Sequence, residues 1–156
     1  MSTLEDRIRR IEDREAMHER LLAYYVACDT CSDVDGIVDC FTEDANFDLS
    51  GLGIAAMRGH AEIRDFFTGV FRDMAHHAHF ITNFRLSRQE GDEAIGHAYV
   101  IGMGKAHAGA DVLVHANLEL GFVRTDAGWK LASFVEGAQM PLPESIGEVH
   151  GHRQPA

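Results

Sequence analysis

The sequence has few prolines, few cysteines and no long hydrophobic run, and each shortage excludes a class of protein. Three prolines across 156 residues leave no Pro-rich linker, and the length suits one domain with a real core. Three cysteines cannot all pair, which argues against a disulfide framework and favours a reducing compartment. No stretch is long enough to span a membrane, and the first residues lack the pattern of a signal peptide. We therefore expect a cytoplasmic domain without membrane association.

Positive charge is also scarce. Lys and Arg number 14 against 25 Asp and Glu, which gives a net charge of −11. Because no basic patch is available to neutralise phosphates, we expect no nucleic-acid partner. The charged stretch 12–15, Glu-Asp-Arg-Glu, is typical of a solvated helix face with i,i+4 pairs.

The first half of the chain shows helical periodicity. Ser2 and Glu5 have capping-box spacing, which predicts a helix that begins at once and continues to Asp29. A second such box at Ser32 and Asp35 predicts a short helix. Apolar residues at helical spacing predict a third helix over about 59–74.

The remaining segments are of β type. Short strands are expected at 45–49 and 55–57, followed by long ones at 77–86, 93–103, 112–124 and 129–136. Residues 90–92 and 125–128 have the composition of hairpin turns. Three helices and an antiparallel meander predict an α+β domain over 1–140, in which a curved sheet and the helices enclose a cone-shaped pocket. Residues 141–156 are expected to form an irregular tail.

Asp29 is the first candidate for chemistry. Leu22, Tyr25, Val26 and Asp29 lie at offsets 0, +3, +4 and +7, which places them on one helical face, and the apolar members indicate that this face is buried. A buried carboxylate needs a hydrogen-bonding partner. The histidines of segment 74–80, Met-Ala-His-His-Ala-His-Phe, are the obvious candidates. An Asp that holds a His in an apolar cavity is suited to removing a proton from a small substrate.

Two further patterns could indicate metal or redox chemistry. Cys28 and Cys31 form a Cys-x-x-Cys motif, but it lies near the end of a helix, and Cys40 alone does not complete a zinc site, so we interpret them as small buried residues. His76 and His77 could join a third histidine around a metal, yet the sequence specifies no clear third ligand. We expect neither a metal nor an organic cofactor.

Three landmarks give the chain a family resemblance. They are the segment 24–29 (Tyr-Tyr-Val-Ala-Cys-Asp) with 41–47 (Phe-Thr-Glu-Asp-Ala-Asn-Phe), the segment 57–63 (Met-Arg-Gly-His-Ala-Glu-Ile), and the segment 79–83 (His-Phe-Ile-Thr-Asn). With these the chain resembles the SnoaL-like branch of the nuclear transport factor 2-like superfamily over nearly its whole length. The resemblance implies that superfamily's curved antiparallel sheet with three N-terminal helices.

The resemblance also implies roles for single residues. Scytalone dehydratase and hexachlorocyclohexane dehydrochlorinase pair the His of the third landmark with an Asp at the end of the first helix, which corresponds to His79 and Asp29. Asn117 matches a substrate-binding Asn, and Tyr24 matches the tyrosine of bile-acid dehydratases. Two arginine features of these relatives are not matched: segment 134–138 reads Phe-Val-Glu-Gly-Ala, and Arg124 is followed by a threonine.

The remaining candidates depend on strand parity and apolar character. Alternation along the strand groups His79 with Ile81 and Asn83, opposite Phe80, Phe84 and Leu86. Aromatic and small apolar residues that are core in the simplest interpretation could also line the pocket wall: Phe47, Phe67, Phe71, Ala98 and Val100.

Together these features favour a cofactor-independent lyase, of dehydratase or dehydrohalogenase type, acting on a small apolar cyclic substrate. His79 would be the base, Asp29 its partner, and Tyr24 and Asn117 hydrogen-bond donors. One alternative is an isomerase or polyketide cyclase, although no strand-borne Asp suited to a ketosteroid isomerase site is evident. Another is a non-catalytic binding module or accessory subunit.

The long strands predict self-association. Ala98 and Val100 alternate with Ile95, Tyr99 and Ile101, so both faces of the sheet carry apolar residues. Helices can cover only one face of a curved sheet, and a large exposed apolar face is rare in a monomer. We expect a homo-oligomer, and the family resemblance points to trimers or dimers.

Overall fold

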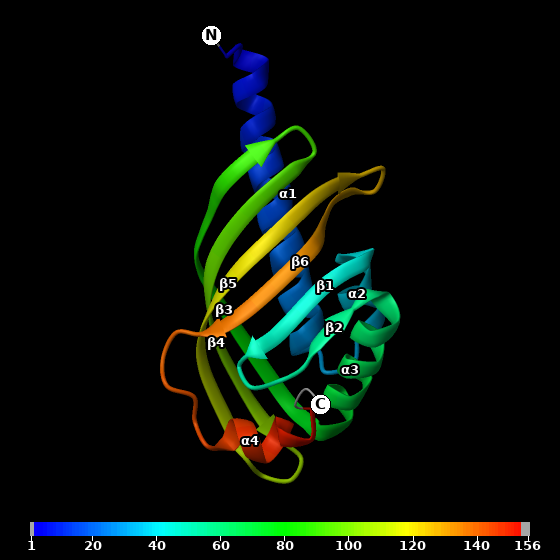
Figure 1. Cartoon of the computed structure of the whole chain (residues 1–156), viewed down its shortest axis with the longest axis vertical. Helices are drawn as coiled ribbons and strands as arrows, with labels where there is room; N and C mark the ends of the chain where they lie inside the picture. The colour runs from blue at the N-terminus through cyan, green and yellow to red at the C-terminus, as the bar shows by residue number, and fades with distance from the viewer. Residues whose placement is uncertain (1, 154–156) are drawn as a thin grey trace.

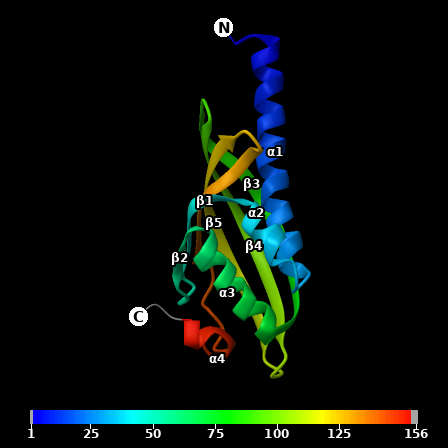
Figure 2. The ribbon, with the colours of Figure 1, turned by 90° about the vertical axis from the view of Figure 1, so that its right-hand side faces the viewer.

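The computed structural model describes residues 2–153, which form a curved sheet with helices on its concave side (Figures 1 and 2). In chain order the elements are α1 (Leu4–Asp29), α2 (Val34–Asp39), β1 (Phe41–Gly51), β2 (Ala56–Arg58), α3 (Gly59–Asp73), β3 (Met74–Glu90), β4 (Glu93–Ala106), β5 (Asp111–Thr125), β6 (Gly128–Ala138), α4 (Ser145–His150) and a short 3-10 helix (Gly151–Arg153). The predicted α+β class is confirmed.

One open sheet holds all the described strands. Its order is β2-β1-β6-β5-β4-β3, in which β1 and β6 run parallel and the other neighbours antiparallel. Strands β1, β3, β5 and β6 are longer than predicted at both ends and β4 is longer at its C-terminal end, whereas β2 is shifted by one residue. Strand pairing continues into residues whose side chains give no alternating signal. No helix among residues 2–153 combines the length and apolar character needed to cross a membrane.

Helix α1 begins one residue later than its sequence suggests. Thr3 is the N-cap, and its hydroxyl and the Asp6 carboxylate form the capping box, so the predicted pair of Ser2 and Glu5 is wrong by one position. Helix α2 is likewise capped by Asp33, whose carboxylate accepts from the Gly36 amide, and the predicted cap at Ser32 is wrong. Adjacent capping residues compete, and the sequence alone does not rank them.

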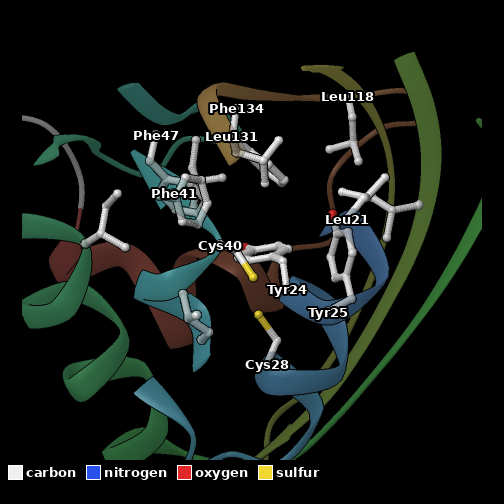
Figure 3. Close-up of a cluster of buried hydrophobic side chains, with 14 of the residues drawn as sticks. Leu21, Tyr24, Tyr25, Cys28, Cys40, Phe41, Phe47, Leu118, Leu131 and Phe134 are labelled. Carbon is white, nitrogen blue, oxygen red and sulfur yellow. The ribbon is translucent and has the colours of Figure 1, made fainter. Parts of the chain in front are cut away.

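The buried face of α1 also differs from the predicted one. Val26 is 66% exposed, whereas Leu21, Tyr24, Tyr25 and Cys28 are buried. These four have the same 0, +3, +4, +7 spacing as the predicted set, so the pattern fits two helical phases. The face that is buried in the structure is the one that contains both tyrosines. Their rings pack into an aromatic cluster that includes Phe41 and Phe134 (Figure 3). Asp29 therefore lies at the edge of the buried face.

Asp13 anchors α1 to the sheet. It is 6% exposed, so the prediction of a solvated face at 12–15 is wrong for this residue. One of its carboxylate oxygens accepts from Trp129 Nε1 at 3.1 Å, and the other accepts from Arg124 at 2.7 Å and from Gln89 at 2.8 Å. Donors from β3, β5 and β6 thus converge on one carboxylate. Beyond this anchor the N-terminal end of the helix projects past the sheet (Figures 1 and 2).

A bulge in β3 changes the predicted strand parity. Asn83 has φ +57°, and the register with β4 shifts between Thr82 and Arg85. One extra residue at this point reverses the alternation beyond it. Phe84 accordingly packs against the core on the same side as His79, contrary to the prediction, while Phe80 on the other face is 55% exposed.

The C-terminal segment is ordered where it is described. The prediction of an irregular tail over 141–156 is wrong for 145–153, which form α4 and the 3-10 helix, while 154–156 lie outside the described residues. Arg153 pairs with Asp73 at the end of α3 and donates to the Val149 carbonyl. Ile146 and Val149 are buried. The segment thus packs beside the end of α3 and closes part of the interior.

Candidate active site

The end of α1 and the middle of β3 meet at one hydrogen-bonded pair. His79 Nδ1 lies 2.6 Å from Asp29 Oδ1, and the His79 backbone N–H donates to Asp29 Oδ2 at 3.2 Å. The carboxylate can only accept, so the proton of a neutral His79 resides on Nδ1 and leaves Nε2 unprotonated. The structure therefore brings together the two residues that the sequence analysis paired.

The pair is partly exposed rather than deeply buried. The side chain of Asp29 is 34% exposed and that of His79 is 19% exposed. Burial alone would raise the pKa of Asp29, but the hydrogen bonds and charge of His79 outweigh it and hold that pKa below its ordinary value. Asp29 is therefore ionised at neutral pH, with its charge held against the imidazole.

Beside the pair is a cavity of about 120 Å³ with mainly apolar walls. An apolar cavity of roughly 150 Å³ is large enough for benzene, so this one suits a compound of about one ring. Its wall includes Tyr24, Phe67 and His79 among the predicted residues, together with side chains of β1, β5 and α4. Tyr25 also belongs to the wall, and its ring centroid lies 4.8 Å from that of His79.

Glycines on β4 make room for the two histidines that face the cavity. Gly102 is paired with His79, and a Cβ at Gly102 would lie 3.5 Å from His79 Nε2. Gly104 is paired with His77, and a Cβ there would crowd Met74 and the His77 ring. Because Gly102 and Gly104 have no Cβ atoms, the imidazole of His79 borders the open cavity.

His77 is a neighbour of the pair with a different environment. Its Nδ1 lies 3.3 Å from the Cys28 carbonyl, which can only accept, and its ring centroid is 5.6 Å from that of His79. Burial and the nearby His79 lower the pKa of His77. His76 points the other way and is exposed. Within residues 2–153, no group of three or more His, Cys, Asp or Glu side chains is arranged to hold a metal ion, and the three cysteines are free thiols.

Several predicted wall residues lie elsewhere. Asn117 is exposed on the opposite face of β5, so its predicted place in the pocket is wrong; strand parity with buried Ala116 and Leu118 decides this. Phe47, Ala98 and Val100 are buried in the core and do not border the cavity. Phe71 is also outside the cavity wall, with its ring 6.4 Å from that of His77.

Glu136 is a cavity residue that the sequence analysis missed. It follows Phe134 by two positions on β6, which turns both side chains inward, and it lines the cavity. Burial raises its pKa to about 7. Glu136 shares the strand parity of the apolar Phe134, and this alternation is the sequence signal that marks it as an inward-facing acid.

Residues 9–135 match the model of the SnoaL-like domain. A candidate aromatic ring hydroxylase from Novosphingobium aromaticivorans is 47% identical, with a TM-score of 0.84 over 87% of this chain and 97% of the other. A search of curated protein sequences gives no match.

Two more distant structures share the fold. A candidate scytalone dehydratase from Novosphingobium aromaticivorans is 14% identical, with a TM-score of 0.76 over 84% of this chain and 87% of the other. A hexachlorocyclohexane dehydrochlorinase, LinA type 2, is 20% identical, with a TM-score of 0.75 over 84% and 88%.

Proposed function

Because the chain belongs to the SnoaL-like domain family, we propose that it is a cofactor-independent lyase that removes a proton from a small cyclic substrate. The observation that carries the proposal is the 2.6 Å contact between Asp29 and His79 at the edge of an apolar cavity. The names of two structural neighbours, a candidate dehydratase and a dehydrochlorinase, both denote eliminations, which is the reaction class proposed for this chain.

In this mechanism His79 is the general base. Nε2 takes a proton from a carbon next to a carbonyl, the C–H electrons form a double bond, and the bond from the neighbouring carbon to the leaving group breaks. Asp29 fixes the Nδ1–H tautomer and stabilises the imidazolium that forms. The leaving hydroxide takes a proton from solvent to become water, and His79 later returns the substrate's proton to solvent, so that the net products are the unsaturated compound and one water.

A second candidate function is an isomerase that moves a double bond. Glu136 favours it, because a carboxylic acid beside a tyrosine is the arrangement that stabilises a dienolate in ketosteroid isomerase. His79 would take the proton and return it to another carbon. The difference from elimination is that no group leaves.

Single-ring probes of matched size separate these functions. Elimination converts 3-hydroxycyclohexanone to cyclohex-2-enone, and isomerisation converts cyclohex-3-enone to the same product, which absorbs in the ultraviolet. We expect turnover of the hydroxyketone without added cofactor and after exhaustive chelation. A reaction that needs O₂ and a reductant would instead support the hydroxylase chemistry named for the 47% identical relative.

The dyad is tested with Asp29→Asn, His79→Gln and the double variant. Loss of a general base costs about 10²–10⁴-fold, and the double variant should be hardly worse than His79→Gln, because both residues serve one proton transfer. His76→Gln is the matched control, since His76 is exposed on the same strand. Fully multiplicative losses would refute the dyad. Binding of probes without any turnover would support a binding module.

A further inference from the structure

The carboxyl group of Glu136 has no partner of its own. Glu136 lies near the end of β6, paired with Leu118 on β5, and its side chain is partly buried and faces the cavity. Among residues 2–153, none of the side-chain hydrogen bonds or ion pairs includes it. A carboxyl group without a partner in an apolar surrounding indicates a missing ligand or a functional role.

The groups that face Glu136 provide no positive charge at its side of the cavity. From α1 they are Tyr24, Tyr25 and Cys28. Across the cavity lie His77 and His79 of β3 and His150 of α4, and no Lys or Arg lines the described wall. Burial, together with Arg153, lowers the pKa of His150 to about 4, so that ring is neutral near pH 7. Burial raises the pKa of Glu136 to about 7, which leaves a large neutral fraction at that pH.

Tyr25 provides a second observation at the same place. Its hydroxyl is the one buried side-chain polar atom in the described chain without a hydrogen-bond partner. Burial first, and then the charge of Glu136, raise the pKa of Tyr25, and both residues line the cavity. The Tyr25 ring also packs against His79. Glu136 therefore shares the cavity with an unpaired Tyr25 hydroxyl and with His79 of the dyad.

We propose that Glu136 is the substrate-recognition residue of this cavity, and that its carboxyl group donates a hydrogen bond to a carbonyl oxygen of an uncharged ring compound. The inference rests on the proposed function in placing the substrate beside His79, and it names the substrate class: neutral ketones of about one ring, with carboxylates excluded. An anion would meet a carboxyl group and no cation, which disfavours its binding.

Cyclohexanone is the critical probe because it only accepts hydrogen bonds. Its dissociation constant is measured by titration of ¹⁵N-labelled protein at pH 5.5 and pH 8.5, beside cyclohexanol, which can also donate, and cyclohexanecarboxylate. The variants are Glu136→Gln, whose amide donates at every pH, and Glu136→Leu, which has no donor. The ¹⁵N spectrum of each free variant reports its fold.

We expect cyclohexanone to bind the unmodified protein at least fivefold more tightly at pH 5.5 than at pH 8.5, because ionised Glu136 cannot donate. Cyclohexanol should show less dependence on pH, and the carboxylate should bind at least tenfold more weakly than the ketone. Glu136→Gln should bind the ketone equally at both pH values, and Glu136→Leu weakly at both.

Two results would overturn the proposal. A pH dependence that persists in Glu136→Gln would assign it to the histidines, and equal ketone binding by Glu136→Leu and the unmodified protein would remove the donor role. If Glu136→Leu does not fold, the pH dependence of ketone binding in Glu136→Gln still tests the proposal. The measurement requires no turnover, so a failed dyad test leaves it intact, and a failed binding test leaves the dyad results intact.

Discussion

Replacing Glu136 by Gln should make the protein more stable at alkaline pH. Burial raises the pKa of Glu136 from 4.5 to about 7. Since the folded state holds the proton more tightly than the unfolded chain, the folded state is favoured most below pH 4.5. That advantage is lost progressively as the pH rises through 7.

The magnitude follows from the size of the shift. At about 1.4 kcal/mol per pKa unit, ionising Glu136 costs roughly 2 kcal/mol more stability at pH 8.5 than at pH 5.5. Because the Glu136 side chain is only partly buried, solvent screens part of the charge, so about 1–2 kcal/mol is expected, which corresponds to roughly 2–8 °C in Tm for a chain of this size. Gln has nearly the same shape and no charge, so it avoids this cost.

The assay is thermal unfolding of the unmodified protein and Glu136→Gln between pH 5.5 and 8.5. The difference in Tm should grow with pH in favour of the variant. Glu119→Gln is the matched control, because Glu119 is exposed on the neighbouring strand β5, and its Tm should follow that of the unmodified protein. Parallel curves for Glu136→Gln would refute the assigned burial and with it the neutral carboxyl group.

Three other outcomes follow from the fold. Asp13→Ala should lower the free energy of unfolding in urea by about 3 kcal/mol, because it leaves buried donors unpaired, whereas Asp92→Ala, which removes an exposed pair, should cost less than about 1 kcal/mol. Hydrogen-exchange protection factors of α4, which are corrected for the pH dependence of the intrinsic exchange rate, should fall between pH 6.5 and pH 4, since the His150 pKa is lowered to about 4 and stability present above pH 6.5 is lost on acidification; His150→Gln should abolish the change. Sedimentation equilibrium should show a dimer or trimer, because Phe80 and Leu113 are 55% and 48% exposed on the outer face of the sheet, and a 17.3 kDa monomer would contradict this interface.

The order of elements was predictable because long periodic segments carry a strong signal. Helix α1 and the four long strands needed only the change from a period of 3.6 to a period of 2. What could not be predicted is decided by tertiary packing. Tyr24 and Cys28, rather than Val26, face the core because the aromatic cluster of β1 and β6 accepts the larger rings.

The sequence predicted part of the site, and one of the arguments behind that prediction was incorrect. The pairing of Asp29 with His79 came from the resemblance and from a helical face that proved to be one residue out of phase. The prediction that Asn117 lies in the pocket was wrong, because its position in the strand alternation turns its side chain outward despite the motif match. Glu136 was missed, although the same alternation turns its side chain inward. The bulge at Asn83 leaves no mark in composition, since a non-glycine residue in the left-handed region is uncommon.

That bulge has a consequence for recombination between homologous genes. It divides β3 into a segment that carries His77 and His79 and a segment whose Phe84 packs under α1. After a crossover within the strand, the inward side chains of both segments still face the core only if both parents have the extra residue at the same place. A parent without it would contribute a chimera in which either the imidazoles or the supporting aromatic residue faces solvent. Crossover points for chimeric libraries therefore belong in the turns at 91–92 or 126–127, outside the strand.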